Sequence, residues 1–434
     1  MNQQIEKIKA LLLNKVKGIR WNYFNLEAGK MNFIKNEEPD SKWFDNIIME
    51  SGGWKWQGDA PESNEIMKQL VNAINKDPSI LFVAMTDIYK LKHIPYNSDA
   101  DEGVMGALNR QNSEARNRLF LDKMKKGFRS KEGNMVILAE GDSWFQFPRI
   151  AVAGIPVRDF VRDIGDHLGN RKDIAWYNLA YAGDWLSNML YDGRYVTELD
   201  NVEPHVFLIS GGGNDMVGGK RIKTFVKAAQ PKPHKVDSLL LQQLLNFRQY
   251  TKSNQHSTFN QNKYSLGLSW IQDGFIDFLN CIYIQYLSLF VRVYKNTDKF
   301  RNLLTITQGY DYVLPSDDNA RGIEVGHSLV NKFIGNGKWL KFPMTEKGIL
   351  KSADQEAILY TMIFEFNELM LDFARADNFP NVAHIDSRGL ASNKNDWFDE
   401  LHLESEIFKK VADKFYTCID HFRKNNGVLK KSIF

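Results

Sequence analysis

The chain has 434 residues, 43% of them hydrophobic and 12% aromatic, and its 56 basic and 53 acidic side chains leave a formal charge of +3. A chain of this length can bury a large core, and this aromatic content excludes a disordered protein. The near balance of charge gives no reason to expect a nucleic-acid partner.

The first 130 residues carry no motif with evident chemistry, and we expect a small accessory region of unknown role there. The amino terminus favours an amphipathic helix over a signal peptide, because only Ala10–Leu13 are continuously apolar. We therefore expect a cytoplasmic protein. The cysteines, Cys281 and Cys418, each lie in an apolar helical pattern, and no Cys-x-x-Cys or His-x-x-x-His spacing predicts a metal site.

From residue 131 onward, short apolar runs alternate with helical patterns. The predicted strands are Met135–Ala139, Ala175–Leu179, Val206–Ser210, Leu303–Thr307 and Val382–Asp386. Strands that alternate with helices predict right-handed crossovers and a parallel sheet covered on both faces. We expect an α/β domain over residues 131–434, with helical insertions at about 218–300 and 315–350.

Three helical patterns add detail to this domain. An apolar face from Val157 to Leu168 predicts the first helix, and Ser352-x-x-Gln355 predicts a capping box at the start of a later one. The apolar stretch Gly274–Val293 is not a membrane span, because polar side chains recur along it at helical spacing. We favour a helix packed on its neighbours, with a hydrophobic lid over the site as the alternative.

Residues suited to catalysis follow the first three predicted strands. Ser143 follows the first strand, Gly183 the second and Asn214 the third. The carboxyl ends of parallel strands open on the same edge of a sheet, so these residues should converge. Asp399 and His402 stand before the last helix, and their spacing of three places both on one face of a turn or helix.

Each of these residue types has a chemical reason to be there. A serine hydroxyl becomes a nucleophile when a base removes its proton, and His402 suits that task near neutral pH. A carboxylate such as Asp399 holds the imidazole in one tautomer. The backbone amides of Ser143 and Gly183 and the side-chain amide of Asn214 are candidate donors to an oxyanion. Four aromatic residues near this rim are candidate walls of an apolar or sugar-binding pocket: Trp144, Trp185, Tyr310 and Trp397.

The order of these blocks resembles the SGNH (GDSL-type) hydrolase superfamily, as Gly141-Asp142-Ser143, Gly183, Gly212-Gly213-Asn214-Asp215 and Asp399-x-x-His402. The resemblance implies a flavodoxin-like three-layer α/β/α sandwich that hydrolyses esters, thioesters or O-acetyl groups without a metal or organic cofactor. It implies Ser143 as nucleophile, His402 as base and Asp399 as its orienting partner, with an oxyanion hole at Ser143, Gly183 and Asn214. Trp144 and Leu403 stand where the family often has leucine and proline, which leaves the subfamily and the substrate open.

The expected function is therefore a metal-independent serine esterase, lipase or O-acetyl esterase. Two alternatives stay open: a non-catalytic binding protein on the same fold, with residues 1–130 as its functional part, and a peripheral membrane lipase with Gly274–Val293 as its lid. The expected partner is a small-molecule, lipid or glycan ester, with no nucleic acid and no integral membrane segment. The sequence defines neither the acyl group nor the alcohol nor the oligomeric state.

Overall fold

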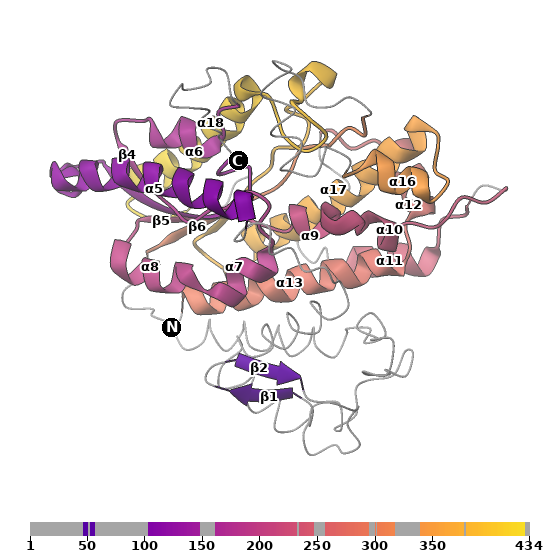
Figure 1. Cartoon of the computed structure of the whole chain (residues 1–434), viewed down its shortest axis with the longest axis horizontal. Helices are drawn as coiled ribbons and strands as arrows, with labels where there is room; N and C mark the ends of the chain where they lie inside the picture. The colour runs from indigo at the N-terminus through magenta and orange to yellow at the C-terminus, as the bar shows by residue number, and fades with distance from the viewer. Residues whose placement is uncertain are drawn as a thin grey trace. The chain divides into compact units, whose positions relative to one another are not determined.

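The computed structural model in Figure 1 describes part of the chain. The described residues are 47–50, 53–56, 103–147, 161–231, 234–246, 257–294, 300, 302–316, 339–376 and 379–429. The chain divides into two compact units. One comprises Met1–Tyr96, Leu190–Asp192 and Ile276–Arg301, and the other comprises Asn97–Met189, Gly193–Phe275 and Asn302–Phe434.

The second unit is built on a five-stranded parallel sheet. Its strands are β3 (Met135–Gly141), β4 (Ile174–Asn178), β5 (Val206–Ser210), β6 (Leu304–Gln308) and β7 (Val382–Ile385). Their order is β4-β3-β5-β6-β7, and every neighbouring pair is parallel. This is the 2-1-3-4-5 strand order of flavodoxin-like folds. The predicted α/β fold and its five strands are confirmed, with strand ends shifted by two residues or fewer.

The described helices precede, connect and follow these strands along the chain. In chain order they are α5 (Gly103–Lys125), η2 (Phe128–Ser130), α6 (Ile164–Gly169), α7 (Leu186–Asp192), α8 (Arg194–Val202), α9 (Gly213–Val217), η3 (Gly218–Lys220), α10 (Ile222–Phe225), α11 (Ser238–Asn246), α12 (Gln261–Trp270), α13 (Asp273–Val293), α16 (Lys341–Glu346), α17 (Ser352–Arg375), η4 (Lys394–Asp396) and α18 (Ser405–Lys424). The first unit holds an antiparallel hairpin of β1 (Ile47–Glu50) and β2 (Gly53–Trp56).

Helices cover both faces of the sheet, as the alternating pattern predicts. On one face, the Phe145 ring lies edge-on to Trp176 of β4 and to Phe415 of α18, with centroids 5.6 and 5.8 Å apart. On the other face, Tyr195 of α8 stacks on Phe207 of β5 at 5.6 Å. Side chains alternate along a strand, so neighbouring residues of the sheet anchor opposite layers. Figure 1 shows α6 and α18 on one side of the strands and α8 on the other.

The edge strand β4 is covered by α5. The Asn117 side chain donates to the Asn178 carbonyl at 2.9 Å and accepts from the Asn178 N–H at 2.7 Å, so it takes the place of a neighbouring strand. Lys123 donates to the carbonyls of Gly169, Arg171 and Ile174 at 2.6 to 3.0 Å. Residues 103–130, which the sequence assigned to the accessory region, belong to the compact unit that contains the sheet.

The start of one predicted helix and the cap of another need correction. The predicted face from Val157 begins outside the described residues, and α6 starts only at Ile164, because Asp163 caps it by accepting from the Asp166 N–H. The helix α17 begins at Ser352 as expected, but without the predicted capping box. Its Gln355 amide instead donates to the Ile349 carbonyl at 2.7 Å.

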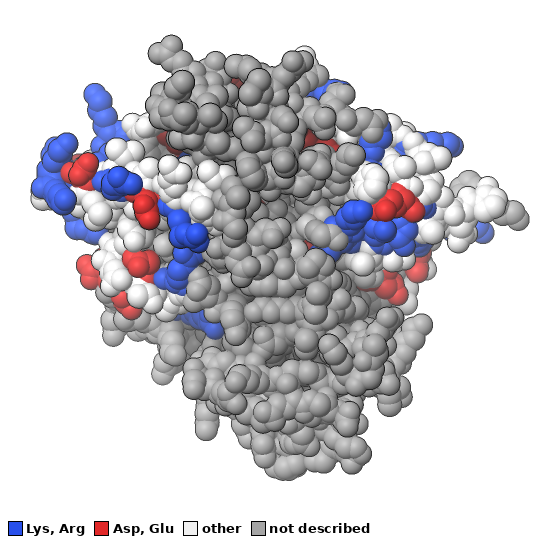
Figure 2. Space-filling model, viewed as in Figure 1, with Lys and Arg blue, Asp and Glu red and all other residues white. Residues whose placement is uncertain are grey.

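The two expected insertions are described to different extents. Where it is described, residues 218–300 form helices, including α12 and α13. Most of the excursion at 315–350 lies outside the described residues. No described helix is both long enough and apolar enough to cross a membrane. Basic and acidic side chains are interspersed on the described part of the face in Figure 2, and the absence of a nucleic-acid partner stays a prediction.

Candidate active site at the carboxyl edge of the sheet

Ser143 lies where the chain leaves β3, between its neighbours β4 and β5. This is the switch point of the strand order, at which ligands bind in open α/β sheets. Gly141 ends β3, and a Cβ there would lie 2.9 Å from the Ser210 carbonyl oxygen, so the close approach of β5 requires glycine. The N–H groups of Phe145 and Gln146 then donate to the Asp142 carbonyl at 3.1 and 3.0 Å. This tight turn holds Ser143 at the rim of the sheet.

Ser143, His402 and Asp399 form a continuous hydrogen-bonded chain. The Ser143 Oγ lies 2.7 Å from His402 Nε2, and His402 Nδ1 lies 2.9 and 2.8 Å from the two Asp399 carboxylate oxygens. A carboxylate accepts, so Nδ1 carries the proton and Nε2 is left to accept from the serine hydroxyl. The three residues are 8%, 5% and 8% exposed. Residues separated by 259 positions are thus brought together as the topology predicts.

The loop that carries His402 is held by Asp399 itself. Its Oδ1 accepts from the backbone N–H groups of Leu401 and His402, both at 2.8 Å. The Phe147 ring lies edge-on to the imidazole, with centroids 4.9 Å apart. Hydrogen bonds on one side and an aromatic contact on the other therefore define the position of the His402 ring.

Asp142, next to Ser143, ties together the ends of three strands. Its Oδ1 accepts from the Trp144 N–H at 3.0 Å and lies 3.1 Å from the Ser210 hydroxyl of β5. Its Oδ2 accepts from the Tyr310 hydroxyl, beyond β6, at 2.5 Å. Burial raises the pKa of Asp142, although these hydrogen bonds act in the opposite direction. Asp142 therefore holds the turn that carries Ser143 against β5 and the stretch after β6.

Two of the three candidate oxyanion donors, Gly183 and Asn214, follow β4 and β5, the strands on either side of β3. Asn214 follows β5 in α9, and its side-chain Nδ2 donates to the Asp184 carbonyl at 2.8 Å. Gly183 precedes Asp184 and has a φ of 83°, a left-handed conformation that favours glycine. The Asn214 bond thus fastens the turn after β4 to the turn after β5. Whether these groups serve an oxyanion stays a prediction.

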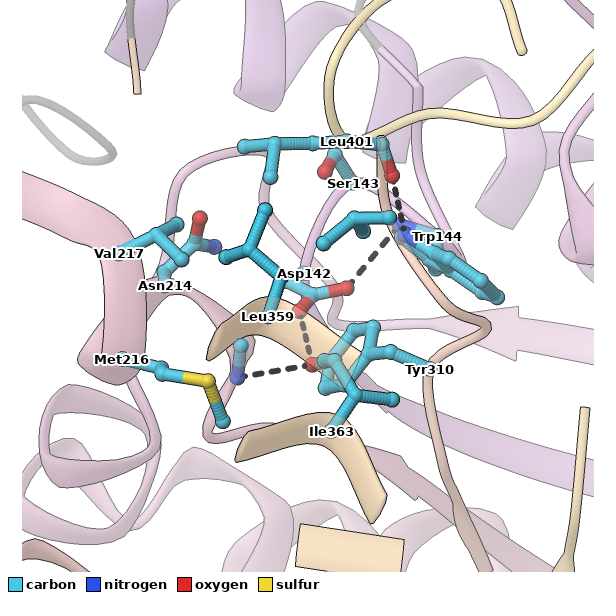
Figure 3. Close-up of a pocket in the computed structure, with 12 residues that line it drawn as sticks. Asp142, Ser143, Trp144, Asn214, Met216, Val217, Tyr310, Leu359, Ile363 and Leu401 are labelled. Carbon is cyan, nitrogen blue, oxygen red and sulfur yellow. Dashed lines mark hydrogen bonds between the residues drawn. The ribbon is translucent and has the colours of Figure 1, made fainter. Parts of the chain in front are cut away.

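A pocket opens beside Ser143, and its empty space together with the solvent at its mouth is about 470 Å³. It is lined by Asp142, Ser143, Trp144, Gly213, Asn214, Met216, Val217, Tyr310, Val313, Leu359, Ile363 and Leu401. Figure 3 shows Ser143 and Leu401 at the top of the view and Ile363 at the bottom. Of the four predicted aromatic walls, Trp144 and Tyr310 line this pocket, whereas Trp185 and Trp397 are not among its lining residues. No described residue of α13 lines it either.

The two remaining tryptophans have other surroundings. The guanidinium of Arg221 lies over the Trp185 ring, 5.1 Å from its centroid. Trp397 pairs with Leu403 in an isolated antiparallel bridge, and its side chain is 4% exposed. Trp397 therefore shapes the loop that carries His402, and Trp185 packs near the start of α7.

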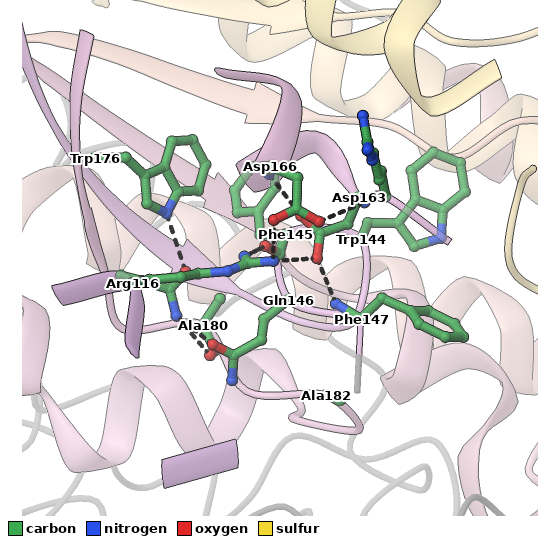
Figure 4. A network of polar contacts seen from close by, with 12 residues as sticks. Arg116, Trp144, Phe145, Gln146, Phe147, Asp163, Asp166, Trp176, Ala180 and Ala182 are labelled. Carbon is green, nitrogen blue, oxygen red and sulfur yellow. Dashed lines mark hydrogen bonds and ion pairs between the residues drawn. The ribbon is translucent and has the colours of Figure 1, made fainter. Parts of the chain in front are cut away.

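Sequence reasoning missed a buried network behind the nucleophile turn (Figure 4). Arg116 of α5 donates to the Phe145 carbonyl, to Asp163 Oδ2 at 2.5 Å and to Asp166 Oδ1 at 3.1 Å. Asp163, with a fully buried side chain, also accepts from the Phe147 N–H at 2.7 Å. Arg116 thereby holds the chain two residues after Ser143. Its stretch of sequence is polar and resembles an exposed loop, so no pattern marks it.

Sequence reasoning also missed Glu400, which lies between Asp399 and His402. Its carboxylate accepts four backbone N–H groups at 2.8 to 3.0 Å, from Ser316, Trp339, Leu340 and Lys341. Burial raises the pKa of Glu400, and these four bonds oppose that effect. Glu400 therefore fastens two distant stretches of the chain to the loop of His402. Its position between two candidate catalytic residues is the one sequence signal that could have found it.

No cluster of three or more histidine, cysteine, aspartate or glutamate side chains with the geometry of a metal site occurs within the described ranges. The expectation of a metal-independent site stays a prediction.

No family model matches the sequence, and the comparison with curated proteins gives no significant match. Several solved structures resemble the chain at low identity. A family 3 carbohydrate esterase from Clostridium thermocellum has a TM-score of 0.30 and 12% identity, over 67% of this chain and 98% of its own. An Axe2 variant, an acetyl xylan esterase from Geobacillus stearothermophilus, has a TM-score of 0.27 and 11% identity, over 69% and 99%.

A third structure is LAE5, an alpha/beta hydrolase enzyme from the metagenome of Lake Arreo in Spain. It has a TM-score of 0.27 and 9% identity, over 66% of this chain and 95% of its own. With TM-scores of 0.30 or below, these likenesses establish neither a family nor an activity for this chain.

Proposed function

We propose that this protein is a serine hydrolase of the SGNH type, which cleaves a carboxylic ester through an acyl-enzyme on Ser143. The observation that carries the proposal is the 2.7 Å contact between Ser143 Oγ and His402 Nε2, with Asp399 on the other ring nitrogen. A nucleophile, a base and an orienting carboxylate in hydrogen-bond reach are what acyl transfer requires.

In this mechanism, Ser143 Oγ attacks the ester carbonyl while His402 Nε2 takes the hydroxyl proton. His402 then passes that proton to the leaving alcohol as the carbon–oxygen bond breaks. Water enters, gives a proton to His402 and attacks the acyl-enzyme, and the acid leaves as Ser143 regains its proton. Asp399 stays ionised and stabilises the imidazolium formed in each half.

The oxyanion of each tetrahedral intermediate would be bound by the N–H groups of Ser143 and Gly183 and by the Asn214 side chain. The Asn214 amide has two N–H bonds, and the bond to the Asp184 carbonyl uses one of them, which leaves the second as a donor. Removing one such donor costs about 3 kcal/mol of transition-state stabilisation in a related type of site.

Turnover of p-nitrophenyl butyrate by Ser143→Ala tests this proposal. We expect the variant to lose all measurable enzymatic turnover, because no other nucleophile stands beside His402 Nε2 within the described part of the site. The control is Ser130→Ala, which changes an exposed serine far from the site that bonds only to the Gly127 carbonyl at 2.8 Å. Undiminished activity in Ser143→Ala would refute the proposal, and inactivity of the wild type would favour the non-catalytic alternative.

A further inference from the structure

The wall of the pocket beside Ser143 is apolar over most of its extent. Its apolar members come from four places in the chain: Met216, Val217, Val313, Leu359, Ile363 and Leu401. Leu359 and Ile363 are one turn apart on α17, and their side chains are 1% and 4% exposed. Figure 3 shows Met216 and Ile363 at the end of the pocket away from Ser143.

The polar groups in the wall are largely engaged with one another. The Tyr310 hydroxyl donates to Asp142 and accepts from the Gly213 N–H at 3.1 Å. The Trp144 indole N–H donates to the Leu401 carbonyl at 3.1 Å. A sugar ring needs a hydrogen-bonding partner for each hydroxyl that leaves water, and a wall of this kind supplies few. The chemistry of the wall therefore suits an aliphatic chain.

The residues that line the pocket bear on which part of an ester substrate would enter it. In the proposed mechanism the leaving alcohol must face His402 Nε2, which protonates it, and His402 is not among the lining residues. Asn214, the candidate oxyanion donor, does line the pocket together with Ser143. A substrate with its carbonyl carbon at Ser143 Oγ and its oxygen toward Asn214 would direct its acyl substituent into this space.

We propose that this pocket binds the acyl chain of the substrate, and that the protein prefers esters of longer saturated acids, such as hexanoate, over acetate esters. The inference rests on the proposed function and names its substrate class. Each methylene that leaves water should raise kcat/KM about 4-fold, which corresponds to about 0.8 kcal/mol.

The test measures kcat/KM on p-nitrophenyl esters of acetate, butyrate, hexanoate and octanoate, each divided by its uncatalysed hydrolysis rate. We expect the corrected kcat/KM for hexanoate to exceed that for acetate by about 100-fold. This is somewhat less than the roughly 250-fold that four methylenes would give at about 4-fold each. In Leu359→Trp the larger ring fills the pocket, so this ratio should fall at least 10-fold. Leu350→Trp is the matched control, because Leu350 is 72% exposed just before α17, and its ratio should equal that of the wild type.

A second variant keeps the test decisive if the tryptophan destabilises the fold. Leu359→Ala enlarges the pocket, and it should move the preferred ester toward octanoate. Labelling of Ser143 by a fluorophosphonate, read in parallel, separates the two proposals. If Ser143 is labelled but acetate is preferred and the Leu359 variants leave the ratio unchanged, the acyl-pocket inference is wrong while the hydrolase proposal stands. If Ser143 is neither labelled nor able to turn over any ester, both are wrong.

Discussion

Replacing Arg116 with alanine should destabilise the unit that contains the sheet by about 3 kcal/mol. The substitution leaves Asp163, whose side chain is fully buried, without its cationic partner. Removing one member of a buried ion pair typically costs about 3–5 kcal/mol, because the remaining charge stays out of water. Asp163 keeps its bonds from the N–H groups of Phe147 and Asp166, so we expect the lower end of that range.

The assay is urea unfolding followed by circular dichroism, with Arg118→Ala as the matched control on the same helix. Arg118 is 73% exposed and lies 3.8 Å from Glu114, an exposed pair of a kind worth about 0.3–0.5 kcal/mol. Ester turnover should also fall in Arg116→Ala, because the guanidinium binds the Phe145 carbonyl behind Ser143. If the two variants unfold within about 1 kcal/mol of each other, the reasoning on this network is wrong.

Three further predictions concern other buried groups. Glu400→Gln places an NH₂ group against two of the four backbone N–H donors. We therefore expect the free energy of unfolding in urea to fall by about 3 kcal/mol and kcat to decrease. A variant as stable as the wild type would contradict this. Burial lowers the pKa of His384 to about 3, below its unfolded value of 6.5. Because the unfolded chain takes up a proton in this range and the folded protein does not, the contribution of His384 to stability is present above pH 6.5 and is lost as the pH falls toward 3. Between pH 6.5 and 5 the loss should be about 2 kcal/mol, and His384→Gln should flatten the slope; an equal slope in both proteins would count against it. Asp399→Asn should lower kcat about 10⁴-fold, the effect of the wrong imidazole tautomer in serine proteases, and a loss of less than 10-fold in stopped-flow assays would exclude the orienting role.

The strands could be predicted because their signal is local. Each is a short apolar run that ends in glycine or polar residues, and burial on both faces of a parallel sheet selects such runs. The covering helix α5 could not be placed in the same way. Its Phe120 ring lies edge-on to Tyr177 of β4 at 5.1 Å, but Asn117 and Lys123 hold it to the sheet through hydrogen bonds to backbone groups, which helical periodicity does not detect.

The candidate site likewise has one part that the sequence predicts and one part that it does not. Ser143 and His402 meet because parallel topology brings strand ends to one edge, so motif order was sufficient to predict their approach. The apolar wall was not predictable, since Leu359 and Ile363 look like ordinary core residues of a long helix. Trp185 and Trp397 do not line this pocket, and nearness in sequence to a catalytic motif does not decide which way a side chain points.

The central claim is that Ser143 is a nucleophile activated by His402. Intact-mass spectrometry after treatment with a fluorophosphonate, followed by peptide mapping, tests it most directly. The account predicts a single adduct on Ser143 in the wild type, and a large loss of labelling rate in His402→Ala. An unmodified protein, or an adduct on another residue at equal rate in both proteins, would contradict it.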